Sequence, residues 1–158
     1  MSVRIEVIAV ANRQPDWVTA GFESYARRLR GSCTLSLREL ALARRTASTP
    51  IARAIESEGT RMLAALPKGA HVVALDETGD AWSTMELAAR LRRWLDRGTP
   101  VALVIGGPDG LAPMCRERAD ECWALSRLTL PHGLVRIVVA EAVYRAAMML
   151  AGHPYHRA

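Results

Sequence analysis

The chain ends in GHPYHRA, residues 152–158, and this tail carries side chains that can do chemistry. A histidine can take up or release a proton near neutral pH, a tyrosine can stack, and an arginine can bind an anion. Chain ends are usually the least ordered part of a domain. Tyr155, His156 and Arg157 nevertheless follow directly after a predicted helix. The tail is therefore a candidate site rather than an expendable end.

A second candidate site is the glycine-rich segment VIGGPDGL, residues 104–111, which follows a predicted buried strand. Its three glycines allow the backbone to turn sharply and to approach a ligand closely. The segment matches neither GxGxxG nor GxxxxGK[ST], lacks a basic residue, and carries Asp109. A phosphate is poorly served beside a carboxylate, whereas hydroxyls, an amino group or a sulfonium are tolerated. The segment argues against a dinucleotide or ATP and leaves room for a phosphate-free nucleoside, and the alternative is a tight turn that binds nothing.

Other groupings of chemical side chains are weaker. Cys115 and Cys122 do not have the C-x2-4-C spacing of zinc sites, so we expect no metal. No GxSxG motif predicts a nucleophilic serine. Glu141 lies in an apolar helix, where a carboxylate is usually paired, and Arg145 one turn later is the expected partner. A direct catalytic role for Glu141 is the alternative.

Strands and helices alternate along the chain that positions these residues. Apolar alternation or continuous apolar runs predict strands at 3–10, 33–40, 71–76, 100–105 and 123–130. Capping and stop signals predict helices from Asp16 to Gly31, from Thr49-Pro50 to Leu66, from the Ser83–Glu86 capping box to Gly98, over 113–121, and from the Pro131-His132-Gly133 turn to Gly152. Residues 41–48 are predicted to form a mobile basic loop and residues 77–81 a polar turn. The order predicts one α/β domain, residues 1–158, with a mostly parallel sheet covered on both faces.

Composition limits the partners of such a domain. The 158 residues include 21 Lys and Arg against 16 Asp and Glu, a formal charge of +5, which permits a polyanionic partner. No dense basic run identifies one. Arg136, Glu141 and Arg145 interrupt the longest late apolar run and argue against a membrane span. Three cysteines without a disulfide pattern predict a reduced, cytoplasmic location.

Five segments form a pattern that extends over nearly the whole chain: PDWV at 15–18, LD at 75–76, IGGPDG at 105–110, LSRLTLPHGLVRIVVAEAVYRA at 125–146, and HPYHR at 153–157. Together they resemble the small bacterial SPOUT-class family of ribosomal RNA large subunit methyltransferase H. The joint presence of IGGPDG, TLPH and the tail makes the resemblance specific. The chain departs from the family pattern by GPDG in place of GPEG, and at Arg127, Gly133 and Ala158.

The resemblance implies an α/β SPOUT fold whose C-terminal segment threads a deep trefoil knot, an arrangement that most chains avoid. It implies a homodimer that uses S-adenosylmethionine to methylate N3 of a pseudouridine in 23S ribosomal RNA, on the assembled ribosome. The cofactor pocket would be formed by Leu75, Gly106, Leu125, Ser126, Arg127, Leu128, Thr129 and Leu130. The last helix is apolar around much of its circumference, which independently supports a subunit interface.

The implied reaction needs a group that assists the loss of the N3 proton, because the imide of pseudouridine is mostly protonated at neutral pH. His132, Tyr155, His156 and Arg157 are the catalytic candidates. We hypothesise that His156 assists deprotonation, that Arg157 binds phosphate or the imide oxygens, and that Tyr155 stacks on or orients the base. The alternative is that Pro154 and Tyr155 only dock the tail.

Two rival functions are compatible with the residues. One is a SPOUT methyltransferase that acts on another RNA, such as tRNA. The other is a non-enzymatic ribosome-binding module, in which Arg44 and Arg45 contact RNA.

Overall fold

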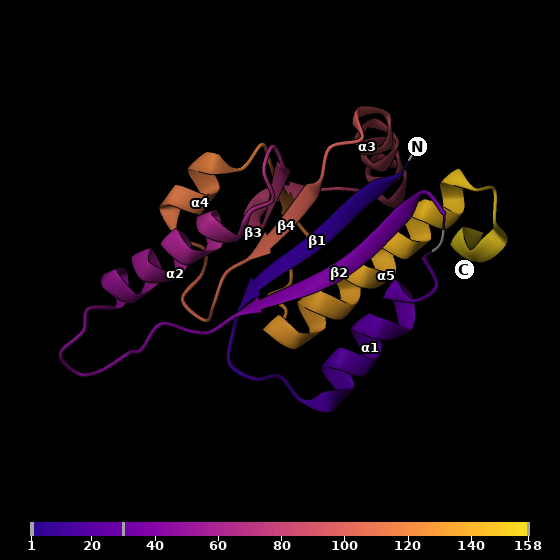
Figure 1. Cartoon of the computed structure of the whole chain (residues 1–158). Helices are drawn as coiled ribbons and strands as arrows, with labels where there is room; N and C mark the ends of the chain where they lie inside the picture. The colour runs from indigo at the N-terminus through magenta and orange to yellow at the C-terminus, as the bar shows by residue number, and fades with distance from the viewer. Residues whose placement is uncertain (1, 30, 158) are drawn as a thin grey trace.

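The computed structural model describes residues 2–29 and 31–157, without the side chains of residues 156 and 157. A five-stranded parallel sheet with the order β2-β1-β4-β3-β5 forms its centre (Figure 1). The strands are β1 (Val3–Val10), β2 (Cys33–Leu40), β3 (His71–Ala81), β4 (Val101–Ile105) and β5 (Glu121–Ala124). The helices are α1 (Asp16–Ala26), α2 (Ile51–Ala65), α3 (Thr84–Arg97), α4 (Pro113–Arg118), α5 (His132–Leu150) and the 3-10 helix η1 (Pro154–Arg157).

Helices cover both faces of this sheet, as the predicted parallel α/β architecture requires. Helices α1, α3 and α5 share one apolar core with the sheet, and α2 and α4 share a second core with the opposite face. Strand β1 contributes to both cores because successive side chains point to opposite faces: Val3, Ile5 and Val7 join the first core, and Ile8 and Val10 join the second. The predicted fold class is confirmed, and the trefoil knot stays a prediction.

Two strand predictions are wrong at their carboxyl ends. Strand β3 continues through the predicted polar turn at 77–81, because a register shift after Leu75 lets Asp80 and Ala81 pair again with β5. Strand β5 ends at Ala124, and residues 125–131 form a loop instead of a strand. The apolar residues of this loop match a strand in composition, but they line a cavity and pair with no strand among the described residues.

Helix ends depend on local hydrogen bonds, and the sequence identified some of them. The Ser83–Glu86 capping box and the left-handed stop at Gly98 are confirmed. Asp16 is the first residue of α1 and makes no side-chain cap, and α2 begins after Pro50 without a side-chain cap from Thr49. The predicted first helix is also too long, because α1 ends at Ala26.

The boundaries of the last two helices complete the framework of the site. Helix α4 ends at Arg118, short of the predicted residue 121, because β5 already begins at Glu121. Helix α5 begins at His132, and Gly152, with φ 75°, follows its end as predicted. No helix in the described part of the chain has the length and apolar character to span a membrane.

Candidate functional site

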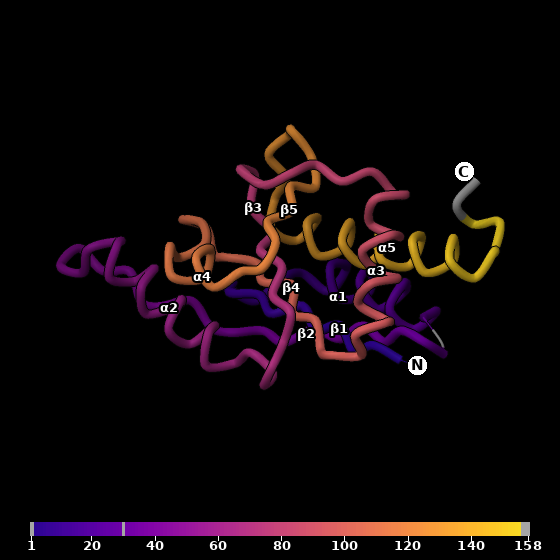
Figure 2. Tube along the Cα trace, turned by 90° about the horizontal axis from the view of Figure 1, so that it is seen from above, coloured from indigo at the N-terminus to yellow at the C-terminus, as the bar shows by residue number. Residues whose placement is uncertain are grey.

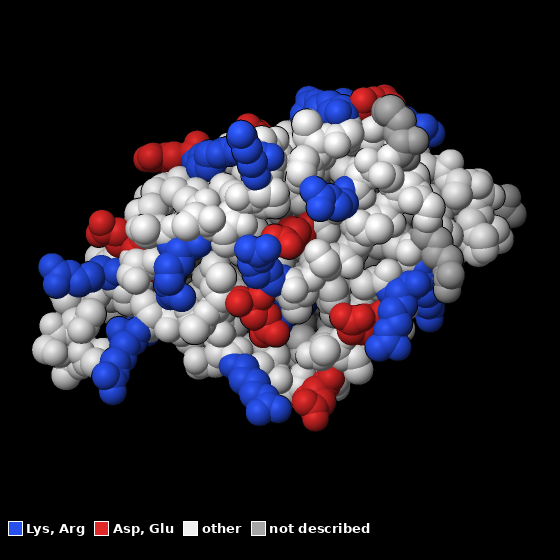
Figure 3. Space-filling view, viewed as in Figure 1, with Lys and Arg blue, Asp and Glu red and all other residues white. Residues whose placement is uncertain are grey.

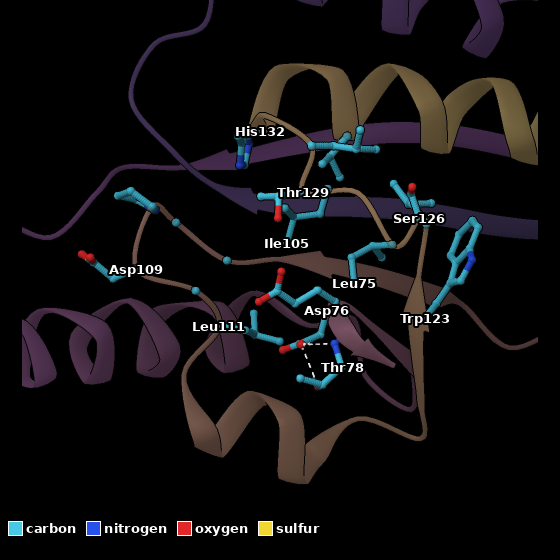
Figure 4. Close-up of a pocket in the computed structure, with 18 of the residues that line it drawn as sticks. Leu75, Asp76, Thr78, Ile105, Asp109, Leu111, Trp123, Ser126, Thr129 and His132 are labelled. Carbon is cyan, nitrogen blue, oxygen red and sulfur yellow. Dashed lines mark hydrogen bonds between the residues drawn. The ribbon is translucent and has the colours of Figure 1, made fainter. Parts of the chain in front are cut away.

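A cavity of about 480 Å³ lies where β3 and β4 end and α5 begins (Figure 4). This is the position at which open parallel sheets usually bind ligands, beyond the carboxyl ends of the strands. Leu75 from β3, Ile105 from β4, and Leu111 form part of its apolar wall, and Trp123 from β5 lines one side. The volume lies within the range of small-molecule and cofactor sites.

The loop at 125–131 contributes much of the remaining wall. The structure brings together seven of the eight residues implied for the cofactor pocket: Leu75, Gly106, Leu125, Ser126, Leu128, Thr129 and Leu130. The exception is Arg127, which is exposed and is not part of the cavity lining. Ser126 stabilises the loop locally, because its hydroxyl oxygen accepts a hydrogen bond of 2.9 Å from the backbone N–H of Leu128.

The glycine-rich segment forms a tight turn at the opposite wall. The backbone N–H of Gly110 donates to the Gly107 carbonyl over 3.0 Å, and the chain folds back on itself. A Cβ atom at Gly106 would lie 2.6 Å from the Gly110 backbone, and Gly110 itself has φ 90°. Both positions therefore require glycine, so that the turn can bring its backbone to the cavity.

Arg45 fixes this turn from outside the cavity. Its Nε atom donates to Asp109 over 2.7 Å, and its Nη1 atom donates to the buried carboxylate of Glu58 over 2.6 Å. Glu58 also accepts a hydrogen bond from the backbone of Ala43. Asp109 is among the residues that line the cavity, and its carboxylate is already bound to Arg45 (Figure 4). The negative charge of Asp109 is therefore paired within the chain before any ligand binds.

A second carboxylate, that of Asp76, lies directly after the buried part of β3 and lines the cavity. It accepts hydrogen bonds from the backbone and hydroxyl of Thr78 at 2.9 and 2.8 Å, and from Arg116 at 3.0 Å. Burial alone would raise the pKa of Asp76, but the bonds from Thr78 and Arg116 outweigh it and hold the pKa below its usual value. The cavity wall consequently keeps a negative charge, and Arg116, which also lines it, is already paired.

His132 lines the cavity at the first turn of α5, next to the most deeply buried arginine of the described residues. The Nε atom of Arg136 donates to His132 Nε2 over 3.0 Å, and the imidazole also hydrogen-bonds the Gly106 backbone. Burial, followed by the charge of Arg136, lowers the pKa of His132 to about 4, against smaller opposing effects of Gly106 and Glu39. The ring is therefore neutral at physiological pH. In the sequence, Arg136 stands out only as a charge in an apolar run, and neither its burial nor its contact with His132 could be predicted.

The tail lies at the other end of α5. Tyr155 packs edge-on against Tyr144, with ring centroids 4.7 Å apart, and the guanidinium of Arg145 lies 4.9 Å from its centroid. The predicted pairing of Glu141 with Arg145 is present at 2.7 Å. Figures 1 and 2 show η1 beyond the C-terminal end of α5, whereas His132, which lines the cavity, is the first residue of this helix. The structure therefore does not bring Tyr155 to His132, and the side chains of His156 and Arg157 lie outside the described residues.

Nothing in the described residues forms a metal centre. No group of three or more His, Cys, Asp or Glu side chains there is arranged to hold a metal ion. Cys115 is buried, and its thiol donates weakly to the Gly59 carbonyl at 3.6 Å. Burial raises the pKa of the Cys115 thiol, which makes it an unreactive packing residue.

Comparison with known proteins agrees with this geometry. Residues 3–156 match the model of the family described as "Predicted SPOUT methyltransferase". Two relatives named ribosomal RNA large subunit methyltransferase H are 52% identical over 155 residues. The one from Methylococcus capsulatus matches over 98% of this chain and 100% of its own length, and the one from Thioalkalivibrio sulfidiphilus over 98% and 99%.

Solved structures of more distant proteins share the fold. A probable methyltransferase from Bordetella pertussis Tohama I is 17% identical, with a TM-score of 0.52 over 92% of this chain and 95% of its own. A putative methylase family protein from Neisseria gonorrhoeae is 14% identical, with a TM-score of 0.50 over 90% and 81%. From the family match and the two close relatives, the chain belongs to the SPOUT methyltransferases, in the family of ribosomal RNA large subunit methyltransferase H.

Proposed function

We propose that this chain is an S-adenosylmethionine-dependent methyltransferase that modifies N3 of a pseudouridine in 23S ribosomal RNA, on the assembled ribosome. One observation carries the proposal. The relatives named for ribosomal RNA large subunit methylation are 52% identical over 98% of this chain, and seven of the eight residues that the family resemblance implies for the cofactor line a single cavity.

The chemistry of the cavity fits S-adenosylmethionine, which supplies an electrophilic methyl group on a sulfonium when bound. Three acidic residues line the cavity, Asp76, Glu77 and Asp109, of which Asp76 is paired with Arg116 and Asp109 with Arg45. A phosphate would find no unpaired cation among these side chains, whereas a phosphate-free nucleoside with a net positive charge suits them. Leu75, Gly106 and the loop at 125–130 would hold this group.

The chemistry of the tail residues suggests a different role in the reaction for each of them. Burial, followed by contacts with Tyr25 and Glu141, raises the pKa of Tyr155 above its usual value, so its hydroxyl stays protonated at neutral pH. Tyr155 is therefore suited to stacking and hydrogen-bond donation rather than to proton removal. We assign the proton of pseudouridine N3 to His156 and the charge developing on the imide oxygens to Arg157.

A homodimer explains how this tail can reach a cavity. Helix α5 has 19 residues, so the tail and the cavity of one chain are separated by about 28 Å along the helix. A second copy related by a two-fold axis across α5 would bring its tail to the first copy's cavity. Leu134 and Val138, which are 40% and 37% exposed, form one apolar strip on α5, and Trp17, 56% exposed, lies on the adjacent α1.

Mixing two inactive variants tests both the tail and the dimer. One variant lacks residues 154–158, and the other carries Gly106→Val, whose side chain collides with the backbone of Gly110 and Leu111 and therefore distorts the turn that lines the cavity. If the tail acts on the partner's cavity, the mixture recovers roughly a quarter of the wild-type rate, because half of the dimers are mixed and each has one complete site. No recovery would contradict action across the dimer, and a fully active truncated variant would contradict any role of the tail.

The rival functions make different predictions. Arg45, offered for RNA contact in the non-enzymatic alternative, is bound to Glu58, Asp109 and the Ala43 carbonyl. On the face seen in Figure 3, basic side chains alternate with acidic ones and do not form one continuous patch. Calorimetric titration with S-adenosylmethionine distinguishes an enzyme from a binding module, since only the enzyme binds it stoichiometrically. Methylation of purified tRNA but not of ribosomes would favour the rival SPOUT methyltransferase that acts on another RNA.

A further inference from the structure

The strongest unexplained feature of the molecule is the burial of Arg136. Its side chain is 1% exposed on a helix whose neighbouring residues are apolar, and burying a guanidinium is costly. Glu39 Oε2 lies 3.2 Å from Arg136 Nη1, but Nη1 and Nη2 form no hydrogen bond with the described residues. Ion pairing with a half-exposed Glu39 does not compensate for that cost.

The hydrogen bond that Arg136 does make is directed at the site. Its Nε–H donates to His132 Nε2 over 3.0 Å, so the lone pair of that nitrogen is occupied. An arginine always carries its proton, and His132 must therefore accept at Nε2 and can donate only through Nδ1. The contact of the imidazole with the Gly106 backbone then uses the Nδ1–H group, which fits a carbonyl acceptor.

The position of His132 strengthens this arrangement. It is the first residue of α5, where the positive end of the helix dipole disfavours a second positive charge. The charged groups that face the imidazole are Arg136 from the same helix and Glu39 from β2. Gly106, the residue that it contacts, begins the tight turn that forms one wall of the cavity.

We propose that Arg136 is a positioning residue, which holds His132 as a fixed neutral donor to Gly106 and thereby sets the cofactor-binding turn. His132 then contributes to the affinity for the methyl donor and carries no proton in the reaction, which removes it from the catalytic candidates. The inference rests on the proposed function, since it names the task of residues in that same pocket.

Three variants and a matched control test the proposal by calorimetric titration with S-adenosylmethionine. His132→Ala removes the donor, His132→Gln keeps one donor and one acceptor without a titratable proton, and Arg136→Met removes the support. We expect His132→Ala and Arg136→Met to weaken binding on the order of tenfold, and His132→Gln by less than about threefold. Arg93→Met, an exposed arginine of α3, removes an equal charge and leaves affinity unchanged.

A second measurement does not depend on catalysis or on the cofactor. In the wild-type chain, long-range 15N–1H NMR correlation should show His132 as the Nδ1-protonated tautomer without titration between pH 5 and 8. In Arg136→Met, the same ring should titrate within that range. A wild-type His132 that titrates near pH 6.5, or one protonated at Nε2, would overturn the proposal even if Arg136→Met fails to fold.

The outcomes separate this inference from the proposed function. A wild-type chain that does not bind S-adenosylmethionine contradicts the function, while the NMR result still decides the state of His132. A wild-type chain that binds, with His132→Ala binding equally well, contradicts the positioning role alone. If His132→Gln binds normally but loses methyl transfer together with one limb of the pH–rate profile, His132 is a proton carrier and the proposal is wrong.

Discussion

The individual side chains around the cavity act mainly by holding backbone segments of its wall in place. Arg45 binds Asp109 of the glycine-rich turn, His132 contacts the first residue of that turn, and Asp76 joins β3 to α4 through Arg116. None of these roles follows from residue type alone, because the sequence does not show which arginines are buried and which are exposed. The sequence shows that Arg136 and His132 are one helical turn apart. It does not show that Arg136 is buried, which is what makes its hydrogen bond to His132 unusual.

A pH dependence of stability follows at this scale. The pKa of His132 is lowered from its ordinary value of 6.5 to about 4, so the unfolded chain binds a proton more readily than the folded one. The resulting stability is complete above pH 6.5 and is lost as the pH falls toward 4, at most about 3 kcal/mol. Urea unfolding of the wild-type chain and of His132→Gln across this range measures it.

In His132→Gln the loss between pH 6.5 and 4 should be absent. Asp76, Asp120 and Glu121 provide an internal contrast, because their pKa values are lowered from 3.8, 3.8 and 4.5, and their contribution disappears only at lower pH. Equal slopes for the two proteins over pH 6.5 to 4 would count against the neutral, buried imidazole.

The helices and strands that could be predicted from the sequence are those with a clear local pattern, either hydrophobic periodicity or a capping motif. Strands β1, β2 and β4 and helix α3 lie where periodicity and capping indicate them, because hydrophobic alternation and the Ser83–Glu86 box are local. The continuation of β3 and the loop at 125–131 were not predictable, because strand pairing and the lining of a cavity depend on residues distant in sequence. The resemblance, rather than periodicity, identified that loop as part of the pocket.

The loop at 41–50 joins β2 to α2 and is held down by one arginine. Arg45→Ala would leave the carboxylate of Glu58, which is 4% exposed, without its partner. We expect a loss of about 2–4 kcal/mol in the free energy of unfolding, since removal of one member of a buried ion pair strands the other charge. Arg44→Ala removes an exposed neighbour and should cost less than about 0.5 kcal/mol. Equal urea midpoints for the two variants would refute this role of Arg45.

At the scale of the whole molecule, the proposed homodimer predicts that activity depends on oligomerisation, because the tail and the cavity lie at opposite ends of α5. Val138→Glu places a charge in the exposed apolar strip of α5, and we expect light scattering to change from twice the 17.3 kDa chain mass to the monomer mass. Methylation should fall at least tenfold while the circular dichroism spectrum stays unchanged. Met85→Glu, at a 73% exposed position on α3, is the matched control and should remain dimeric and active. A monomeric wild-type chain with full activity would contradict the dimer.

The most direct measurement follows methyl transfer to the ribosome itself. Ribosomes from a strain that lacks this gene are incubated with the purified chain and S-adenosylmethionine, and nucleosides from 23S RNA fragments are mapped by mass spectrometry. We predict one new methyl group, located at N3 of a pseudouridine, with none in the tRNA fraction. A methyl group in tRNA alone, or on another atom or nucleotide of 23S RNA, would contradict the proposed function.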